Sequence, residues 1–280
     1  MFHIDTYAAW SIAYAAWPIE KFRGLAAPGA GTPRAASRDK EIMTRMPLLD
    51  RNATVAQIVV EHAVAARVFQ KHRIDFCCHG NVSVAEACQE RNLDAEAVYA
   101  EIEAVIPAGT GDGEDPRALS NAALIARIVD RHHGYLRRAL PGIAPLAAKV
   151  AMVHGEHNPK LGPLREAFGA LADALAPHID DEEAILFPAL MSRTPDGDVV
   201  HGELRRMYEE HLAVGHLLAR IRQLADEFTT PDWGCNTYRV LMSELAALEA
   251  DVLRHVHLEN HVLMPRFDGA ENPRAVARPC

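Results

Sequence analysis

The chain has 280 residues, enough for one large or two modest domains, and its formal net charge of −9, with no strongly basic segment, argues against a nucleic-acid-binding surface. No stretch approaches the roughly 18–20 consecutive apolar residues of a membrane helix, so a membrane protein is not expected. The five cysteines are sparse and odd in number, which is not typical of a secreted disulfide scaffold and favours the cytoplasm.

The N-terminal third of the chain is predicted to contain an extension and a small helical domain. Residues 1–49 combine an alanine-rich stretch with a segment rich in Gly, Pro and Ala, and we expect them to be poorly ordered. Residues 50–106 carry apolar side chains at helical spacing in three helices, the first of which continues from Val55 to Phe69. Residues 107–116 contain three glycines, two prolines and three acids, which mark a linker and a domain boundary.

Residues 117–268 are predicted to form four long helices, followed by a C-terminal tail at 269–280. Apolar residues recur at helical spacing, and almost no stretch alternates as a strand does. Breaks that contain proline separate the helices, at Pro141-Gly142, near Pro163, at Thr194–Asp198 and at Thr230-Pro231. The pattern predicts an all-α protein, an up-down four-helix bundle preceded by the small helical domain.

A sequence pattern that occurs twice in the bundle suggests metal binding. His178 is followed four residues later by Glu182, and His255 is followed in the same way by Glu259. In both copies a leucine follows the histidine by eight residues and a proline by ten. Residues four apart lie on one face of a helix, so each copy presents an imidazole beside a carboxylate, a pairing that transition metals accept.

Each predicted bundle helix also has a histidine on or near its apolar face. Spacing does not choose between the adjacent His132 and His133 in the first helix. The four are separated by about one helix and one loop, so antiparallel helices can bring them to one level of the core. Together with two glutamates they are too many for one tetrahedral zinc and suit two metals with bridging carboxylates. The set comprises His133 (or His132), His178, Glu182, His211, His255 and Glu259. Glu183, His257 and His261 are predicted to point away from their motif partners, either as surface groups or as groups that support a ligand from outside.

The sequence also resembles a known family. Asp75-Phe-Cys-Cys-His-Gly80 is similar to the Asp-Phe-Cys-Cys-x-Gly signature of the RIC (repair of iron centres) proteins, bacterial iron–sulfur cluster repair proteins with a hemerythrin-like bundle. The resemblance covers residues 50–268, and the bundle histidines and glutamates occur in the order of that family's iron ligands. The match of Arg131-His-His-Gly-Tyr-Leu-Arg137 to the family's first helix selects His133 over His132.

The resemblance implies two non-haem iron ions, oxo- or hydroxo-bridged, with Glu182 and Glu259 as bridging ligands and the four histidines as terminal ligands. It implies repair of iron–sulfur clusters damaged by oxidative or nitrosative stress, by supplying iron to the damaged proteins. The alternative is a di-iron protein that binds or reduces nitric oxide or dioxygen, so it stays open whether the protein is an enzyme. It also stays open whether the protein forms a homodimer. Cys77 and Cys78 are interpreted as thiols for iron transfer, and the alternative is that they are buried small hydrophobic residues.

Overall fold

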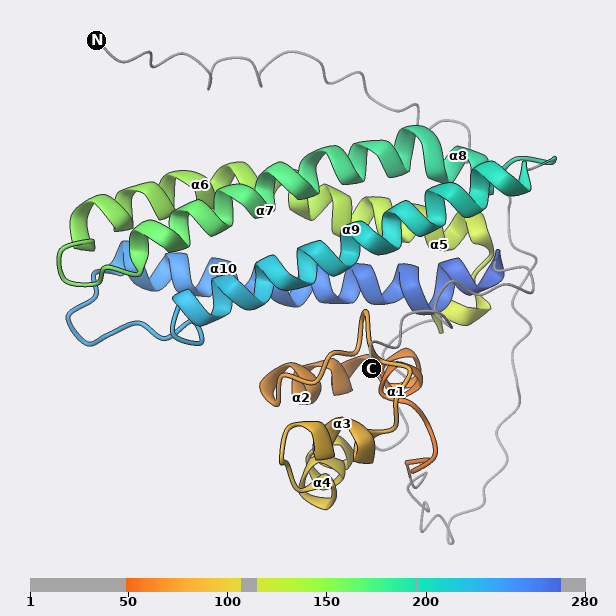
Figure 1. The fold of residues 1–280 in the computed structure, drawn as a ribbon, viewed down its shortest axis with the longest axis horizontal. Coiled ribbons are helices and arrows are strands. Elements are labelled where there is room, and N and C mark those ends of the chain that lie inside the picture. Colours follow the sequence, from red (N-terminus) through yellow and green to blue (C-terminus); the bar gives the residue numbers. More distant parts are fainter. Residues whose placement is uncertain (1–48, 107–114, 195, 268–280) are drawn as a thin grey trace, which may run out of the picture. The chain divides into compact units, whose positions relative to one another are not determined.

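The computed structural model describes residues 49–106, 115–194 and 196–267, which are drawn in colour in Figure 1. The predicted tail, most of the linker and all but the last residue of the predicted extension lie outside these ranges. Within the described ranges the regular elements are helical, as predicted, apart from one antiparallel bridge between Thr54 and Ser83. No helix in this part of the chain combines the length and the apolar character that a membrane crossing requires.

The small domain consists of four short helices, which are α1 (Val55–Glu61), α2 (Ala66–Lys71), α3 (Val84–Glu90) and α4 (Ala95–Val105). Three of them begin at a capping side chain. The Thr54 side chain accepts a hydrogen bond from the backbone N–H of Gln57, and the Gln57 side chain accepts one from the backbone N–H of Thr54. This capping box starts α1. Ser83 and Glu86 form the same box at α3, and Asp94 caps α4.

The continuous helix predicted from Val55 to Phe69 is wrong, because the chain breaks at His62. This residue has φ −135° and ψ 82°, outside the helical region, and a 3₁₀ turn, η2 (Ala63–Ala65), follows it. In an unbroken helix, His62 would lie on the same face as Ile58 and Ala66, which are both buried. The break leaves the imidazole only half-buried, so no polar ring is forced into the core of the small domain.

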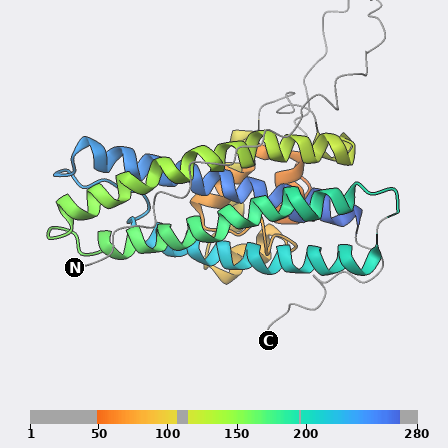
Figure 2. The ribbon, with the colours of Figure 1, turned by 90° about the horizontal axis from the view of Figure 1, so that it is seen from above.

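The bundle has four long helical segments that lie side by side in an up-down arrangement (Figures 1 and 2). The first bundle helix comprises α5 (Asn121–Ile128), the π turn η4 (Val129–His133) and α6 (Gly134–His154). The second comprises α7 (Leu161–Asp181), the π turn η5 (Glu182–Leu186) and α8 (Phe187–Leu190). The third is α9 (Gly197–Leu224), and the fourth comprises α10 (Asn236–Leu258), the π turn η6 (Glu259–Leu263) and a 3₁₀ turn at Met264–Arg266.

The first bundle helix does not end at Pro141-Gly142, as the sequence suggested, but continues to His154 with Pro141 and Pro145 inside it. A proline removes one N–H and displaces the carbonyl four residues earlier. Both prolines lie on the exposed face of α6, where water can satisfy the displaced carbonyls. Pro177 is tolerated on the exposed face of α7 in the same way.

Two apolar clusters fill the bundle, and a polar layer separates them. One cluster lies toward the loops at His154 and Leu224 and includes Leu136, Ile179, Val214 and Val256. The other lies toward the opposite end and includes Ile128, Leu186, Met207 and Val262. The candidate metal ligands lie where these two sets meet, in one stretch on each bundle helix. This layer is therefore enclosed by hydrocarbon above and below, which excludes water from it.

Candidate metal centre

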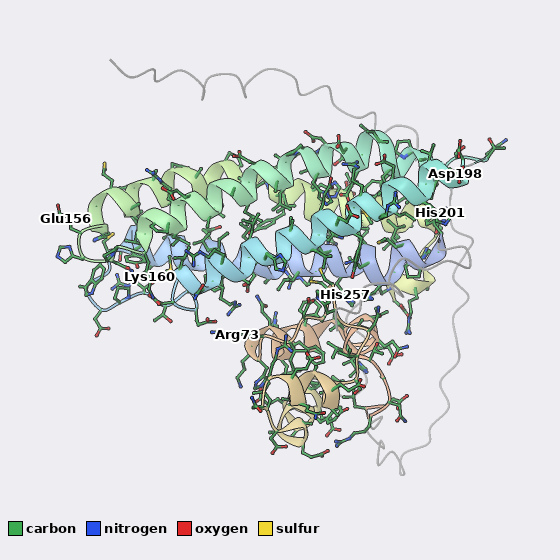
Figure 3. All side chains as sticks on the ribbon, viewed as in Figure 1. Arg73, Glu156, Lys160, Asp198, His201 and His257 are labelled. Carbon is green, nitrogen blue, oxygen red and sulfur yellow. The ribbon has the colours of Figure 1, made fainter. Side chains whose placement is uncertain are left out.

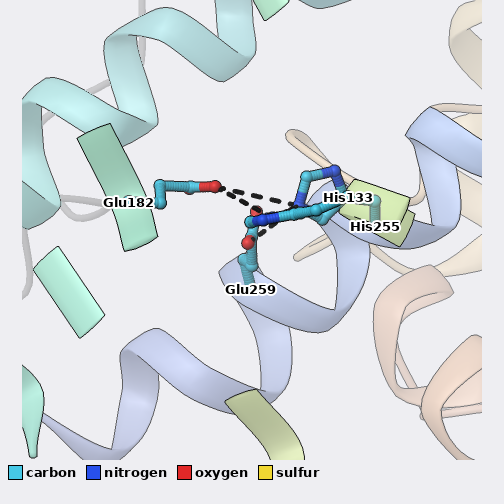
Figure 4. Close-up of side chains that lie close together, drawn as sticks. All are labelled: His133, Glu182, His255 and Glu259. Carbon is cyan, nitrogen blue, oxygen red and sulfur yellow. Dashed lines mark hydrogen bonds and ion pairs between the residues drawn. The ribbon is translucent and has the colours of Figure 1, made fainter. Parts of the chain in front are cut away.

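The six side chains predicted as metal ligands meet in this polar layer of the bundle core. None of them is more than 4 % exposed, although they come from all four bundle helices. Figure 4 shows His133, Glu182, His255 and Glu259 directed toward one another. The full set that the structure brings together is His133, His178, Glu182, His211, His255 and Glu259.

Glu182 faces histidines on two sides with its two oxygens. Its Oε2 lies 3.3 Å from His133 Nε2, and its Oε1 lies 3.3 Å from His178 Nε2. His255 Nε2 also approaches Oε2, at 3.9 Å. One carboxyl group thus presents one oxygen to each of two groups of nitrogens.

Glu259 repeats the arrangement from the fourth bundle helix. Its Oε1 lies 2.9 Å from His255 Nε2, and its Oε2 lies 3.2 Å from His211 Nε2. The six side chains therefore divide into two groups of four, one containing His133 and His255 and the other containing His178 and His211. Both groups contain Glu182 and Glu259. Two carboxyl groups are thus shared by the two sets of donors.

The π turns determine which side chains enter the layer. His133 ends η4, and Glu182 and Glu259 begin η5 and η6. In an α-helix the residue stacked on buried Ile128 would be His132, four positions later. A π turn takes one more residue than an α turn, which moves His133 into that place. His132 instead places its Nδ1 3.1 Å from Asp251 Oδ1, so the structure separates two histidines that spacing did not.

Several polar atoms of the layer are buried without a hydrogen bond, and all of them belong to the six side chains. They are Nδ1 of His255, Nε2 of His178 and His211, both carboxyl oxygens of Glu182, and Oε2 of Glu259, and all of these except Nδ1 of His255 face the layer. Each such atom costs about 1–3 kcal/mol, so a cluster of them calls for a binding partner. Donor atoms that each lie about 2.0–2.2 Å from one metal ion are about 3 Å from one another, as these atoms are. The chemistry of the donor set and its spacing both fit cations.

The charges in the layer compensate one another. Burial alone would lower the pKa of His211, but the carboxyl group of Glu259 outweighs burial and raises that pKa to about 9. The pKa of His133 is likewise raised to about 9 by its two neighbouring carboxyl groups, against the effect of burial. Burial would raise the pKa of Glu259, yet His255 and His211 hold it well below its ordinary value. Bound cations could replace the ring protons and keep this balance of charge.

The outer nitrogen of three of these histidines is held by a further side chain. Glu183 Oε1 lies 2.8 Å from His133 Nδ1, and Glu210 Oε2 lies 2.7 Å from His178 Nδ1. Asn260 Oδ1 lies 2.9 Å from His211 Nδ1. Such partners orient a ring so that its other nitrogen can bind metal. Sequence reasoning missed Glu210 and Asn260, whose only signal was that each adjoins a predicted ligand. The rings so held are those of His133, His178 and His211.

His257 and His261 point away from the centre, as predicted, and contact the small domain instead. His257, labelled in Figure 3, is buried in α10. Its Nδ1 donates to the carbonyl of Phe76 at 3.0 Å. Burial lowers the pKa of His257 to about 4, so its ring is neutral near pH 7. His261 donates from Nε2 to the carbonyl of Cys77 at 2.9 Å. Both histidines therefore bind the cysteine segment rather than the metal layer.

Cys77 and Cys78 lie buried in a tight loop beside the third and fourth bundle helices. Their sulfur atoms are 3.6 Å apart, and Asp75 Oδ1 accepts both backbone N–H groups at 2.9 Å. The Cys78 thiol and burial raise the pKa of Cys77, so this thiol stays protonated near pH 7. At Gly80 an added Cβ would lie 2.7 Å from the carbonyl oxygen of Phe76, so only glycine closes the loop without a clash.

A further group of donor atoms lies in this loop. Side-chain atoms of Asp75, Cys77 and Cys78 come within 4.8 Å of one another. Two thiols and a carboxyl group are donors that soft divalent cations accept. The loop also touches the metal layer, because Cys78 Sγ lies 3.8 Å from the carbonyl oxygen of His211.

Comparisons with known families agree with this division of the chain. The family described as "Hemerythrin HHE cation binding domain" matches residues 124–267, and the one described as "Domain of Unknown function (DUF542)" matches residues 51–106. The first match contains all six residues of the metal layer, and the second contains the cysteine loop.

Named relatives match over most of the chain. The iron-sulfur cluster repair protein ScdA of Staphylococcus haemolyticus is 32% identical over 222 residues, which cover 79% of this chain and 100% of the relative. The iron-sulfur cluster repair proteins YtfE of Yersinia pseudotuberculosis and Yersinia pestis are each 33% identical over 216 residues. Those alignments cover 77% of this chain and 96% of each relative.

Proposed function

This chain belongs to the RIC family of iron–sulfur cluster repair proteins, and on that premise we propose that it repairs clusters damaged by oxidative or nitrosative stress by supplying iron to them. The observation that carries the proposal is the pair of donor groups that share Glu182 and Glu259. Two cations that share both carboxylates fit this layer. Repair of an iron–sulfur cluster requires iron, so iron is the proposed cation.

In this proposal the six side chains hold two non-haem iron ions, which are the cargo. Two histidines and one oxygen from each shared carboxylate would hold each ion, and four protein donors would leave coordination positions on iron for a further ligand. Glu183, Glu210 and Asn260 orient the rings so that Nε2 faces the ions. The oxo or hydroxo bridge expected from the family resemblance stays a prediction.

Cys77 and Cys78 are proposed to pass iron toward the damaged protein. Their support is position, because Cys78 Sγ lies against the turn of α9 that carries His211. A cation leaving the layer on that side would meet two thiols and the Asp75 carboxyl group. A cytoplasmic location is part of the proposal, since free thiols persist in a reducing compartment. Damaged iron–sulfur proteins are the proposed partners, and a homodimer stays a prediction.

Iron transfer can be tested directly with isotopically labelled iron. Protein loaded with labelled Fe(II) is mixed anaerobically with an acceptor whose [4Fe–4S] cluster has lost one iron, and label and acceptor activity are followed. We expect about two iron ions per chain and label appearing in the acceptor as its activity returns. The Cys77→Ala, Cys78→Ala double variant should keep its iron and transfer it more slowly. Iron that no damaged acceptor can withdraw would contradict the donor function.

A second candidate function is favoured by the free coordination positions. A small ligand such as nitric oxide or dioxygen could occupy them, which would make the chain a binding or reducing protein for these gases. Steady conversion of nitric oxide to nitrous oxide with an electron donor would support reduction. A single stoichiometric reaction would rule that activity out and leave binding alone.

A further inference from the structure

The cysteine loop is bound to the bundle through three successive carbonyl groups. His257 Nδ1 donates to the Phe76 carbonyl, and Tyr208 Oη donates to the Cys78 carbonyl at 3.2 Å. The Cys77 carbonyl between them accepts from Asn260 Nδ2 at 2.9 Å and from His261 Nε2 at the same distance. The backbone N–H groups of both cysteines are already bound by Asp75, so the loop docks through its acceptors. The loop residues concerned are Phe76, Cys77 and Cys78.

Asn260 connects this loop to the metal layer. It is 1 % exposed and adjoins Glu259 in η6, and its side-chain amide lies between the Cys77 carbonyl and the His211 ring. Its Nδ2 donates to the Cys77 carbonyl oxygen at 2.9 Å, while its Oδ1 accepts from His211 Nδ1, also at 2.9 Å. The two bonds use opposite ends of one amide group.

This arrangement determines which nitrogen of His211 carries the proton. A carbonyl oxygen can only accept, so the amide nitrogen of Asn260 must face Cys77 and the amide oxygen must face His211. That oxygen can only accept as well, so His211 Nδ1 must carry a hydrogen. In the neutral ring Nε2 then holds the lone pair, and Nε2 is the atom that lies 3.2 Å from Glu259 Oε2 in the metal layer.

We infer that Asn260 is a positioning residue through which the cysteine loop of the small domain sets the tautomer of His211 and thereby couples docking of the loop to retention of the metal. The inference rests on the proposed metal centre. Because coupling is reciprocal, a bound cation should hold the loop in place and protect its thiols, and displacement of the loop should weaken cation binding. Modification of either thiol would then favour release of iron on the side where the thiols lie.

Three variants separate the steps. Asn260→Leu removes both bonds of the amide. Asn260→Asp keeps an acceptor for His211 Nδ1 but opposes the Cys77 carbonyl with a carboxylate, so it breaks only the bond to the loop. Tyr208→Phe is the matched control, since it removes one bond to the loop and leaves the Asn260 amide and its bond to His211 in place. Affinity is measured with Fe(II) alone against a chelator under anaerobic conditions. Thiol modification is followed on the Cys77–Cys78 peptide, with and without Fe(II).

Outer partners of ligand histidines typically change metal affinity about 10–100-fold, and we expect a loss of that size in Asn260→Leu, together with faster thiol modification. Asn260→Asp should keep the wild-type affinity while its thiols react faster. Tyr208→Phe should keep its affinity, and in wild type Fe(II) should slow modification of the thiols. Asn260→Asp tests the tautomer even if Asn260→Leu does not fold.

Three results would overturn the inference. Equal Fe(II) affinity in Asn260→Leu and wild type would show that the amide does not position His211. Loss of affinity in Asn260→Asp equal to that in Asn260→Leu would show that the His211 bond is not the one that matters. Thiol modification at the same rate with and without Fe(II) would exclude the coupling. Wild-type protein that binds no Fe(II) would instead refute the proposed metal centre and the inference with it, a result distinct from the other three.

Discussion

Loss of one carboxyl group from the polar layer should make the metal-free protein less stable. Glu182 is 2 % exposed, and its oxygens lie 3.3 Å from Nε2 of His133 and of His178. Glu182→Leu keeps a similar volume but removes a carboxyl group that helps to raise the pKa of His133 to about 9, so a buried imidazolium loses its partner. Removal of one partner from a buried ion pair costs about 3–5 kcal/mol in free energy of unfolding.

For a chain of this size, a loss of about 3–5 kcal/mol corresponds to a fall in Tm of about 6–20 °C. The same variant should lose the stabilisation that metal confers on wild type, about 4 kcal/mol when free metal is about 1,000 times Kd. Thermal unfolding is followed by circular dichroism in chelator and again with Fe(II). Glu209→Leu, on the exposed face of α9, is the control and should keep the metal-dependent shift. A metal-free Glu182→Leu that melts at or above the wild-type temperature, or one that gains the full shift with Fe(II), would contradict this prediction.

Three further predictions follow from charges outside and inside the layer. The Cys235 thiol, whose pKa is lowered to about 7 by its bond with His154, should be alkylated at half its maximal rate near pH 7, and His154→Ala should move that midpoint upward in a rate–pH profile. The pKa of His211 in the folded protein is raised to about 9, so its stabilising contribution in metal-free protein is full below about pH 6.5 and is lost as the pH rises to about 9. Chelator-treated protein should therefore have a lower Tm at pH 9.5 than at pH 6. Arg222→Met should lower the free energy of unfolding in urea by about 3 kcal/mol, since it leaves buried Glu249 without its guanidinium partner, and an unchanged midpoint would show that the ion pair contributes nothing.

Spacing was sufficient to predict the four bundle helices and five of the six side chains of the metal layer, with His132 and His133 left open in the first helix. The two copies of His-x3-Glu and the single histidines of the other bundle helices recur at the length of one helix and loop, which reflects the regular rise of the α-helix. The capping boxes of the small domain, such as that of Ser83, likewise depend only on residues within one turn. These are local rules, and the described structure follows them.

What spacing could not predict depends on contacts between distant segments or on which face meets water. Pro141 does not end its helix because that face of α6 is exposed, and exposure is a property of the assembled bundle. The choice of His133 over His132 depends on a π turn that no residue type in the segment announces. Asn260 acquires its role from the Cys77 carbonyl, 183 residues away in the chain, so no local pattern could reveal it.

The three π turns also bear on how such bundles change over time. A π turn is an α-helix with one residue added, and the segments on either side keep their places. Removing a single residue, for instance Ala184 within Glu182–Leu186, would restore an α turn while Ile179 and Leu186 stay packed in their own clusters. A helical bundle of this kind can therefore gain or lose one residue within a helix without rebuilding the hydrophobic core on either side of the turn.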